Sequence, residues 1–369
     1  MKCEPHAGHL DFATRLDAQL SGNGSHVWSP WSVAEALSLL AVGARGSTLD
    51  ELAGVLGGDV DGHAAALMGV AAGEPALRTA VSLWVRAGAR VLPEFAAALA
   101  RRPSASVEIG DFAADPDGVR RAVNAHVRDA TGGGIPELLA PRSVTADTRA
   151  VLLSALLVRL RWPVPFAPAR TTRLPFREPG AAERMVPMMR RRGLLSYAEA
   201  RGWRMVSLDG GSGCTLDVLL AEDPAAAAPR AADLVALYRS ARPADIALAL
   251  PRFEVAARAE LNVPLRALGV RTAFSTSADL SGIVDEPLLV DRVVHQARLR
   301  VDEHGAEGSA ATAVLAAPGS ALPPPPPLEF TVDRPFRFAL RKDGVILFLG
   351  HVTSPIDPGE SPPARAADG

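Results

Sequence analysis

The stretch VDEHGAEGSAATAVLAAPGSALPPPPPLEF, Val301–Phe330, joins a strand-like run of small residues to five consecutive prolines, and the two parts cannot belong to one β-strand. Every second residue of its first half is small and uncharged: Ala306, Gly308, Ala310, Thr312, Val314 and Ala316. Because successive side chains of a strand point to opposite faces, this pattern predicts a segment that can enter the middle of a sheet. The charged Glu307 would then face outward.

The five prolines that follow, Pro323–Pro327, have no backbone N–H and favour an extended polyproline conformation, at about 3.1 Å per residue. We therefore interpret the stretch as an exposed loop, stiffly tethered at its C-terminal end, that becomes a strand only when it is cut. A plain flexible linker is the alternative, because runs rich in alanine, glycine and proline often serve that role.

Helices are expected mainly in the first part of the chain and strands after it. Helical spacing predicts four helices: Leu10–Leu20, one from Pro30 with Ser29 as N-cap, one opened by a Thr48–Glu51 capping box, and Val119–Ala130. Strands are predicted at Val81–Val85, Ala150–Leu160, Leu216–Leu220, Ile246–Leu250, Leu288–Val301 and Val345–His351. The nearly continuous apolar run Ala150–Leu160 is typical of a strand covered on both faces. The order favours an α+β fold.

Composition excludes several classes of protein. The chain has 369 residues, 48% of them hydrophobic, and a net charge of -2, which is typical of a soluble globular protein and gives no reason to expect a nucleic-acid partner. Its two cysteines, Cys3 and Cys214, form no metal-binding or disulfide pattern. No signal peptide or membrane span is apparent, so we expect a cytoplasmic protein with no membrane partner, with export left open. No nucleotide, cofactor or hydrolase motif occurs, so we expect no cofactor, no metal and no enzymatic activity.

Several stretches, in order along nearly the whole chain, resemble the serpin family of serine protease inhibitors. They are HVWSPWSVAEALSLLAVGARGSTLDELAGVL (His26–Leu56), VNAHVRDATGGGIPELL (Val123–Leu139), LLSALLVRLRWPVPF (Leu152–Phe166), ALALPRFEV (Ala247–Val255), LRALGVRTAFSTSADLSGI (Leu265–Ile283) and VVHQARLRVDEHGAEGSAAT (Val293–Thr312). We expect a bacterial member of this family. Arginine greatly outnumbers lysine, which indicates a GC-rich coding bias.

The resemblance implies one domain, residues 1–356, with about nine helices, three β-sheets and an exposed reactive-centre loop, followed by a disordered tail, residues 357–369. It implies a monomeric suicide-substrate inhibitor: the loop is cut by a protease and inserts into the large sheet before the acyl-enzyme hydrolyses. A non-inhibitory serpin-fold binding or storage protein is the alternative.

The resemblance also assigns site residues. The hinge of the loop comprises Glu303, Gly305, Ala306, Gly308, Ala310 and Thr312. Counting from Glu303 places the reactive bond at Gly319–Ser320, or one to three residues away, since the interval to Pro335-Phe336 is longer than usual. The small residues there suit an elastase-like or subtilisin-like serine protease, with a cysteine protease as the alternative. The shutter beneath the sheet and the breach at its upper end comprise Ser29, Ser32, Ser154, His295, Arg252 and Trp162. Since Ser154 replaces the family's usual asparagine, we expect a shortened or missing hydrogen bond toward His295.

Overall fold

The computed structural model describes residues 6–22, 24–71, 77–102, 105–159, 162–304 and 325–359. The α-helices are α1 (Ala7–Leu20), α2 (Pro30–Gly43), α3 (Gly46–Val55), α4 (Val60–Ala71), α5 (Pro93–Leu99), α6 (Pro116–Ala130), α7 (Ala231–Ser240) and α8 (Asn262–Leu268). The strands are β1 (His26–Trp28), β2 (Leu77–Arg86), β3 (Ala105–Gly110), β4 (Ala150–Arg159), β5 (Thr172–Phe176), β6 (Arg184–Ala200), β7 (Trp203–Asp209), β8 (Cys214–Ala221), β9 (Arg242–Pro251), β10 (Phe253–Glu260), β11 (Arg292–Val301), β12 (Leu328–Thr331), β13 (Phe336–Lys342) and β14 (Val345–Val352).

The strands form two hydrogen-bonded sheets rather than the three predicted. One has five strands in the order β10-β11-β4-β2-β3, and the other has nine, with β5 attached to β6 beside the path β1-β14-β13-β8-β7-β6-β9-β12. The long strand β6 explains the difference, because it pairs with β9 along Met188–Tyr197 and with β7 along Ser196–Ala200, and so joins two sheets into one. The described residues contain eight α-helices, one fewer than the predicted number. The α+β class is confirmed.

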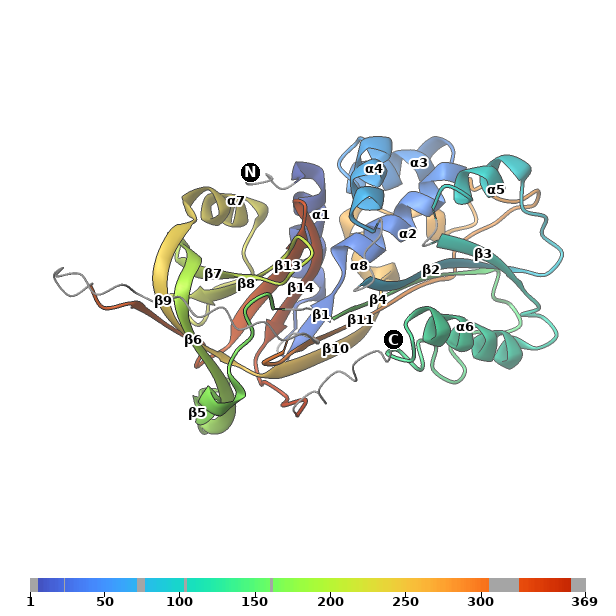
Figure 1. Cartoon of the computed structure of the whole chain (residues 1–369). Helices are drawn as coiled ribbons and strands as arrows, with labels where there is room; N and C mark the ends of the chain where they lie inside the picture. Colours follow the sequence, from blue (N-terminus) through green and yellow to red (C-terminus); the bar gives the residue numbers. More distant parts are fainter. Residues whose placement is uncertain are drawn as a thin grey trace, which may run out of the picture.

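The five-stranded sheet lies between α2 on one face and α6 on the other (Figure 1). Along β4, Leu152, Leu156 and Val158 belong to the main core, which includes α2, whereas Val151 and Leu153 pack with the α6 cluster. Alternation of side chains along a strand produces this division. The prediction that the apolar run is covered on both faces is therefore confirmed.

The predicted start of α2 is confirmed and that of α3 is wrong. The Ser29 hydroxyl caps α2 by accepting from the Ser32 N–H, and Pro30 is the first helical residue. Helix α3 instead begins at Gly46, so Thr48 lies inside it. Glu51 does not reach back to the helix start, because its carboxylate accepts hydrogen bonds from the segment after α8, at Thr272 among others. A tertiary contact thus displaces the local capping box.

The segment that follows β14 runs beside the edge strand β10. The Glu254 N–H donates to the Ile356 carbonyl at 2.8 Å. Asp357 contacts Arg252, which joins β9 to β10, and Gly359 contacts Arg300 of β11, so the predicted tail begins with residues that touch the domain, while residues 360–369 lie outside the described part. Across the described ranges, no helix combines the length and the apolar character needed to cross a bilayer.

Candidate functional site at the β4–β11 seam

The two central strands of the five-stranded sheet, β4 and β11, are parallel neighbours. Their register runs from Arg292 opposite Val151 to Arg300 opposite Arg159. The outer neighbours, β10 beside β11 and β2 beside β4, are both antiparallel to them. A chain that turned back tightly from the end of β11 would run antiparallel to both central strands. The sheet has a second parallel pair, β2–β3, but only the β4–β11 pair, which we call the seam, includes β11 and could take a strand that turns back from its end.

Polar side chains cross the seam halfway along it. Ser154 of β4 lies directly opposite His295 of β11, and the Ser154 Oγ is 2.9 Å from the His295 Nδ1. The Ser32 Oγ, on α2, lies 2.7 Å from the Ser154 Oγ, and the Ser29 N–H donates to the His295 Nε2 at 2.9 Å. All four residues are buried. We call Ser29, Ser32, Ser154 and His295 the serine–histidine network.

The network fixes the protonation of His295. Because the Ser29 N–H donates to Nε2, that nitrogen carries no proton and the ring proton is on Nδ1. Nδ1 then faces both the Ser154 carbonyl oxygen, at 3.0 Å, and the Ser154 hydroxyl. Burial lowers the pKa of His295 to about 4, so the ring is neutral at pH 7. Separating β4 from β11 would break both contacts with Ser154.

The contact toward His295 that we expected to be weakened is present. Although a serine is shorter than the usual asparagine, the Ser154 hydroxyl reaches Ser32 as well as His295. The predicted loss is therefore wrong, because the register of β4 and β11 places Ser154 directly opposite His295, within reach of the shorter side chain.

At the upper end of the seam, the chain leaving β11 is held by several groups. The Trp162 indole N–H donates to the Asp302 carbonyl at 2.7 Å. The Glu303 carboxylate accepts from the Thr171 hydroxyl at 2.6 Å, and its other oxygen lies 3.6 Å from the Arg252 Nη1. Since 3.6 Å exceeds a hydrogen-bond distance, Arg252 and Glu303 form an ion pair only. The Glu303 side chain is 1% exposed and that of Arg252 9%, so the two opposite charges compensate one another while shielded from solvent.

The sequence did not indicate two further groups at this end. Besides the Thr171 hydroxyl, the Phe166 N–H holds Glu303, by donating to its carbonyl at 3.0 Å. The Phe166 ring also packs edge-on against Trp162, with 6.0 Å between centroids. Both residues follow β4, whereas Glu303 follows β11. Phe166 and Thr171 meet Glu303 because the parallel pairing of β4 and β11 brings the ends of these two strands together. No local pattern in the sequence marks such a contact.

Most of the predicted hinge and the predicted bond cannot be placed. Only Glu303 of the hinge is described; outside the described residues lie Gly305, Ala306, Gly308, Ala310, Thr312, Gly319 and Ser320. Of the other predicted site residues, the structure brings together the serine–histidine network at the middle of the seam and Arg252, Trp162 and Glu303 at its upper end.

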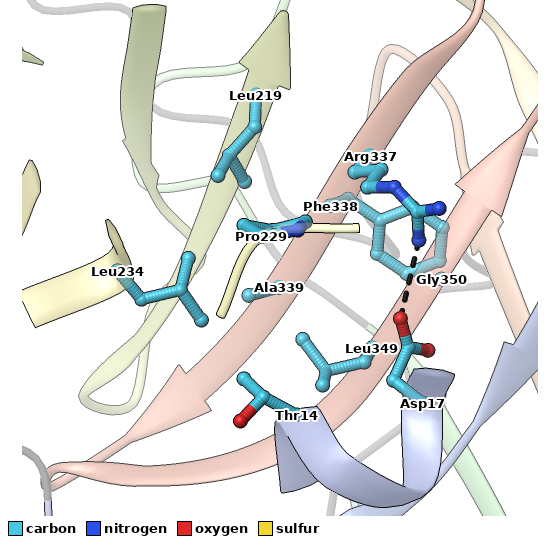
Figure 2. A pocket seen from close by; sticks show the side chains of 10 residues that line it. All are labelled: Thr14, Asp17, Leu219, Pro229, Leu234, Arg337, Phe338, Ala339, Leu349 and Gly350. Atoms are coloured by element: carbon cyan, nitrogen blue, oxygen red, sulfur yellow. Dashed lines mark hydrogen bonds and ion pairs between the residues drawn. The ribbon is translucent and has the colours of Figure 1, made fainter. Parts of the chain in front are cut away.

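A hollow elsewhere in the molecule is built from different elements. It lies between α1, α7 and the strands β8, β13 and β14, and has an empty volume of about 280 Å³, part of it open solvent. Figure 2 shows Arg337 reaching across it to Asp17, with Leu219, Leu234 and Leu349 among the apolar lining. The Arg337–Asp17 ion pair, at 3.1 Å, occupies its polar end. Within the described ranges, no group of three or more His, Cys, Asp or Glu side chains is arranged to hold a metal ion.

Comparison with known proteins gives one consistent family. The serpin family (serine protease inhibitor) matches residues 7–355. The chain belongs to the serpin family. It is 34% identical to the putative serpin-Z12 of rice (Oryza sativa subsp. japonica), covering 96% of this chain and 91% of that one. It is 32% identical to the leukocyte elastase inhibitor of Bos taurus, and the match covers 95% of this chain and 99% of that one.

Solved serpin structures share the fold. Serpin48 of the insect Tenebrio molitor is 27% identical, with a TM-score of 0.81 over 94% of this chain and 96% of that chain. Uncleaved ovalbumin is 23% identical, with a TM-score of 0.82 over 95% of this chain and 99% of that chain. Thyroxine-binding globulin, solved in complex with thyroxine, is 22% identical, with a TM-score of 0.82 over 95% of this chain and 99% of that chain. The serpin fold of this chain is thereby confirmed.

Proposed function

We propose that this serpin is a suicide-substrate inhibitor of a serine protease and not an enzyme. The observation that carries the proposal is the parallel seam, because the predicted reactive-centre loop starts two residues beyond the end of β11. The protease serine hydroxyl attacks the carbonyl carbon of the residue before the cut bond, an ester forms, and the new amino group leaves with the C-terminal fragment. The freed hinge then turns back into the seam, antiparallel to both strands, and carries the ester-linked protease with it.

The energy scale supports trapping. About a dozen newly paired residues at about 0.5–1.5 kcal/mol net per hydrogen bond supply on the order of 10 kcal/mol. Displacing the catalytic groups of the bound protease by about 1 Å lowers its rate about 100-fold, so the ester persists. Insertion breaks the serine–histidine network, the contacts of Thr171 and Phe166 with Glu303, and the backbone ladder between β4 and β11. The inserted strand forms a new ladder with each of its two neighbours, so more backbone hydrogen bonds form than break.

For the target, we propose an elastase-like or subtilisin-like serine protease that cleaves Gly319–Ser320, with a cysteine protease as the second candidate. The residues before this bond, Ala316-Ala-Pro-Gly319, are small or neutral, and no arginine or lysine occurs between His304 and Asp333 to suit a trypsin-like pocket. The name of the bovine relative, leukocyte elastase inhibitor, supports the same class of target.

A serpin-fold binding protein is the second candidate. It is favoured by the likeness to thyroxine-binding globulin in complex with thyroxine, which shows that this fold also serves ligand binding. The uncharged inward side of the predicted hinge favours inhibition instead, since a strand entering a core must not bury an unpaired charge.

The test is incubation with pancreatic elastase or subtilisin, followed by denaturing electrophoresis. We expect a covalent complex that survives SDS and a loop-cleaved form with a raised melting temperature. Ala310→Glu should convert the inhibitor into a substrate, because it would bury a carboxylate, whereas Ala311→Glu, on the intervening face, should leave inhibition intact. Clean turnover of the wild-type chain, or trapping by the Ala310→Glu variant, would refute the insertion mechanism.

Three further properties remain proposals from the sequence. They are a single domain over residues 1–356, action as a monomer in the cytoplasm, and a bacterial source. The relatives named above come from a plant and an animal.

A further inference from the structure

The segment Ser354–Gly359, which we call the C-terminal strap, begins at the end of the part of the chain that matches the serpin family, residues 7–355, and its last four residues lie beyond that part. It runs along the outer edge of β10, where the Glu254 N–H donates to the Ile356 carbonyl at 2.8 Å. Because β10 is an edge strand, the strap covers one of its open backbone groups.

The strap is anchored at its start to the neighbouring sheet. The Ser354 hydroxyl donates to the Glu178 carboxylate at 2.8 Å, and the Arg184 guanidinium donates to the Pro355 carbonyl at 2.5 Å. Arg184 also pairs with Glu178 at 2.7 Å. The strap thus spans from β6 to the edge of the five-stranded sheet.

Farther along, the strap contacts both arginines that hold the start of the loop. Arg252 pairs with Glu303, and its Nε lies 3.1 Å from an oxygen of Asp357. Arg300 donates to the Asp302 carboxylate at 3.1 Å and to the Gly359 carbonyl at 2.9 Å. Each of the two consecutive acidic residues after β11 is therefore held by an arginine that the strap also binds.

The Arg252 contact depends on Asp357 for charge balance. Arg252 is 9% exposed, and its Nε and Nη1 make no hydrogen bond within the described part of the chain, so two ion pairs compensate its charge. The pair with Glu303 is the longer of the two. Without Asp357, a nearly buried guanidinium would retain one carboxylate at 3.6 Å, and its position would be poorly defined.

We propose that the C-terminal strap positions Arg252 and Arg300, and through them fixes the Asp302–Glu303 pivot about which the cleaved loop turns into the seam. Asp357 is a positioning residue for this step. The inference rests on the proposed inhibitory function. A fixed pivot favours insertion over hydrolysis of the acyl-enzyme, because fewer conformations of the severed loop must be searched before its first residues enter the seam.

The test compares the wild-type chain with Asp357→Asn and with a chain ending at Pro355, using subtilisin. The measured quantity is the number of inhibitor molecules consumed per protease inactivated, whose excess above one equals the rate of hydrolysis divided by the rate of insertion. We expect this excess to rise about threefold in Asp357→Asn, which corresponds to about 0.6 kcal/mol, and further in the truncated chain. Asp357→Glu should restore the wild-type ratio, since it keeps the charge.

Asp285→Asn is the matched control. Asp285 is 41% exposed, close to the 42% of Asp357, and pairs with the Arg90 Nε at 3.3 Å away from the strap. We expect it to leave the ratio unchanged. An unchanged ratio in Asp357→Asn would overturn the proposal, as would an equal rise in the Asp285 control.

Hydrogen exchange separates this proposal from the inhibitory function. Failure of the wild-type chain to trap any protease would refute inhibition, but Asp357→Asn should still speed exchange of the His304 amide, which donates to the Asp302 carboxylate at 3.1 Å. Unchanged exchange at His304 would reject the positioning role of the strap even if the protein traps proteases normally.

Discussion

His295 of β11 lies directly opposite Ser154 of β4, and the two side chains hydrogen-bond at 2.9 Å across the seam between these strands. Both are buried, and Ser29 and Ser32 supply their other polar contacts. The same contact therefore stabilises the closed sheet and must break when the sheet opens.

Ser154→Ala should lower the free energy of unfolding of the native protein by about 1–2 kcal/mol, because it removes the partner of Ser32 and one partner of His295. Denaturant unfolding measures the change. Ser207→Ala is the control, since the Ser207 hydroxyl is buried on β7 without a hydrogen-bond partner among the described residues, and its removal should cost much less. Equal losses would mean that the network adds nothing beyond packing.

Acidification should weaken the native state through His295. The folded pKa, about 4, is below the unfolded value of 6.5, so this histidine's contribution is complete above pH 6.5 and is lost as the pH falls toward 4. The loss amounts to about 3 kcal/mol. His295→Gln, which can still accept from Ser29 and donate to Ser154, should show a correspondingly shallower fall in melting temperature. Parallel pH profiles for the two proteins would contradict the assignment.

Glu35 should have the opposite pH dependence. This buried carboxyl on α2 lies 3.7 Å from Arg102, and burial raises its pKa to about 7. Because the folded pKa exceeds the unfolded one, its contribution is complete below pH 4.5 and is lost as the pH rises to 7, by about 3 kcal/mol. Glu35→Gln should therefore gain in melting temperature relative to wild type between pH 5 and pH 8. The exposed Glu260→Gln is the control, and a gain equal to that of the control would count against the mechanism.

Trp162→Phe should increase the rate at which the loop or an added hinge-sequence peptide enters the seam, because it removes an indole donor that bridges the seam from the end of β4 to Asp302. The strap contacts at Arg252 and Arg300 do not cross the seam, so they do not oppose its opening. Trp31→Phe removes a similar bond, from the indole to the Leu67 carbonyl at 2.9 Å, away from the seam. We expect both variants to lose about 1 kcal/mol of stability, but only Trp162→Phe to insert peptide faster. Peptide incorporation followed by native electrophoresis distinguishes them, and equal rates would exclude a gating role for Trp162.

Several features could be predicted because they depend on local order in the chain. The apolar run of β4 predicted a strand covered on both faces, and the Ser29-Pro30 pair predicted the start of α2. The Thr48–Glu51 prediction was wrong because Glu51 finds better donors at Thr272, a residue far along the chain. Local patterns cannot reveal such competition.

By itself, the sequence determined the α+β class and the serpin family, and it predicted a loop whose alternate residues are small enough to enter a sheet. Those features follow from periodicity and from motifs in fixed order. Only the tertiary structure decided which groups hold the loop's first residues: Thr171 and Phe166 reach Glu303, and Asp357 shares Arg252 with it. The physical reason is that parallel pairing of β4 and β11 brings together strand ends that are more than a hundred residues apart in the chain, and no local spacing encodes which side chains meet there.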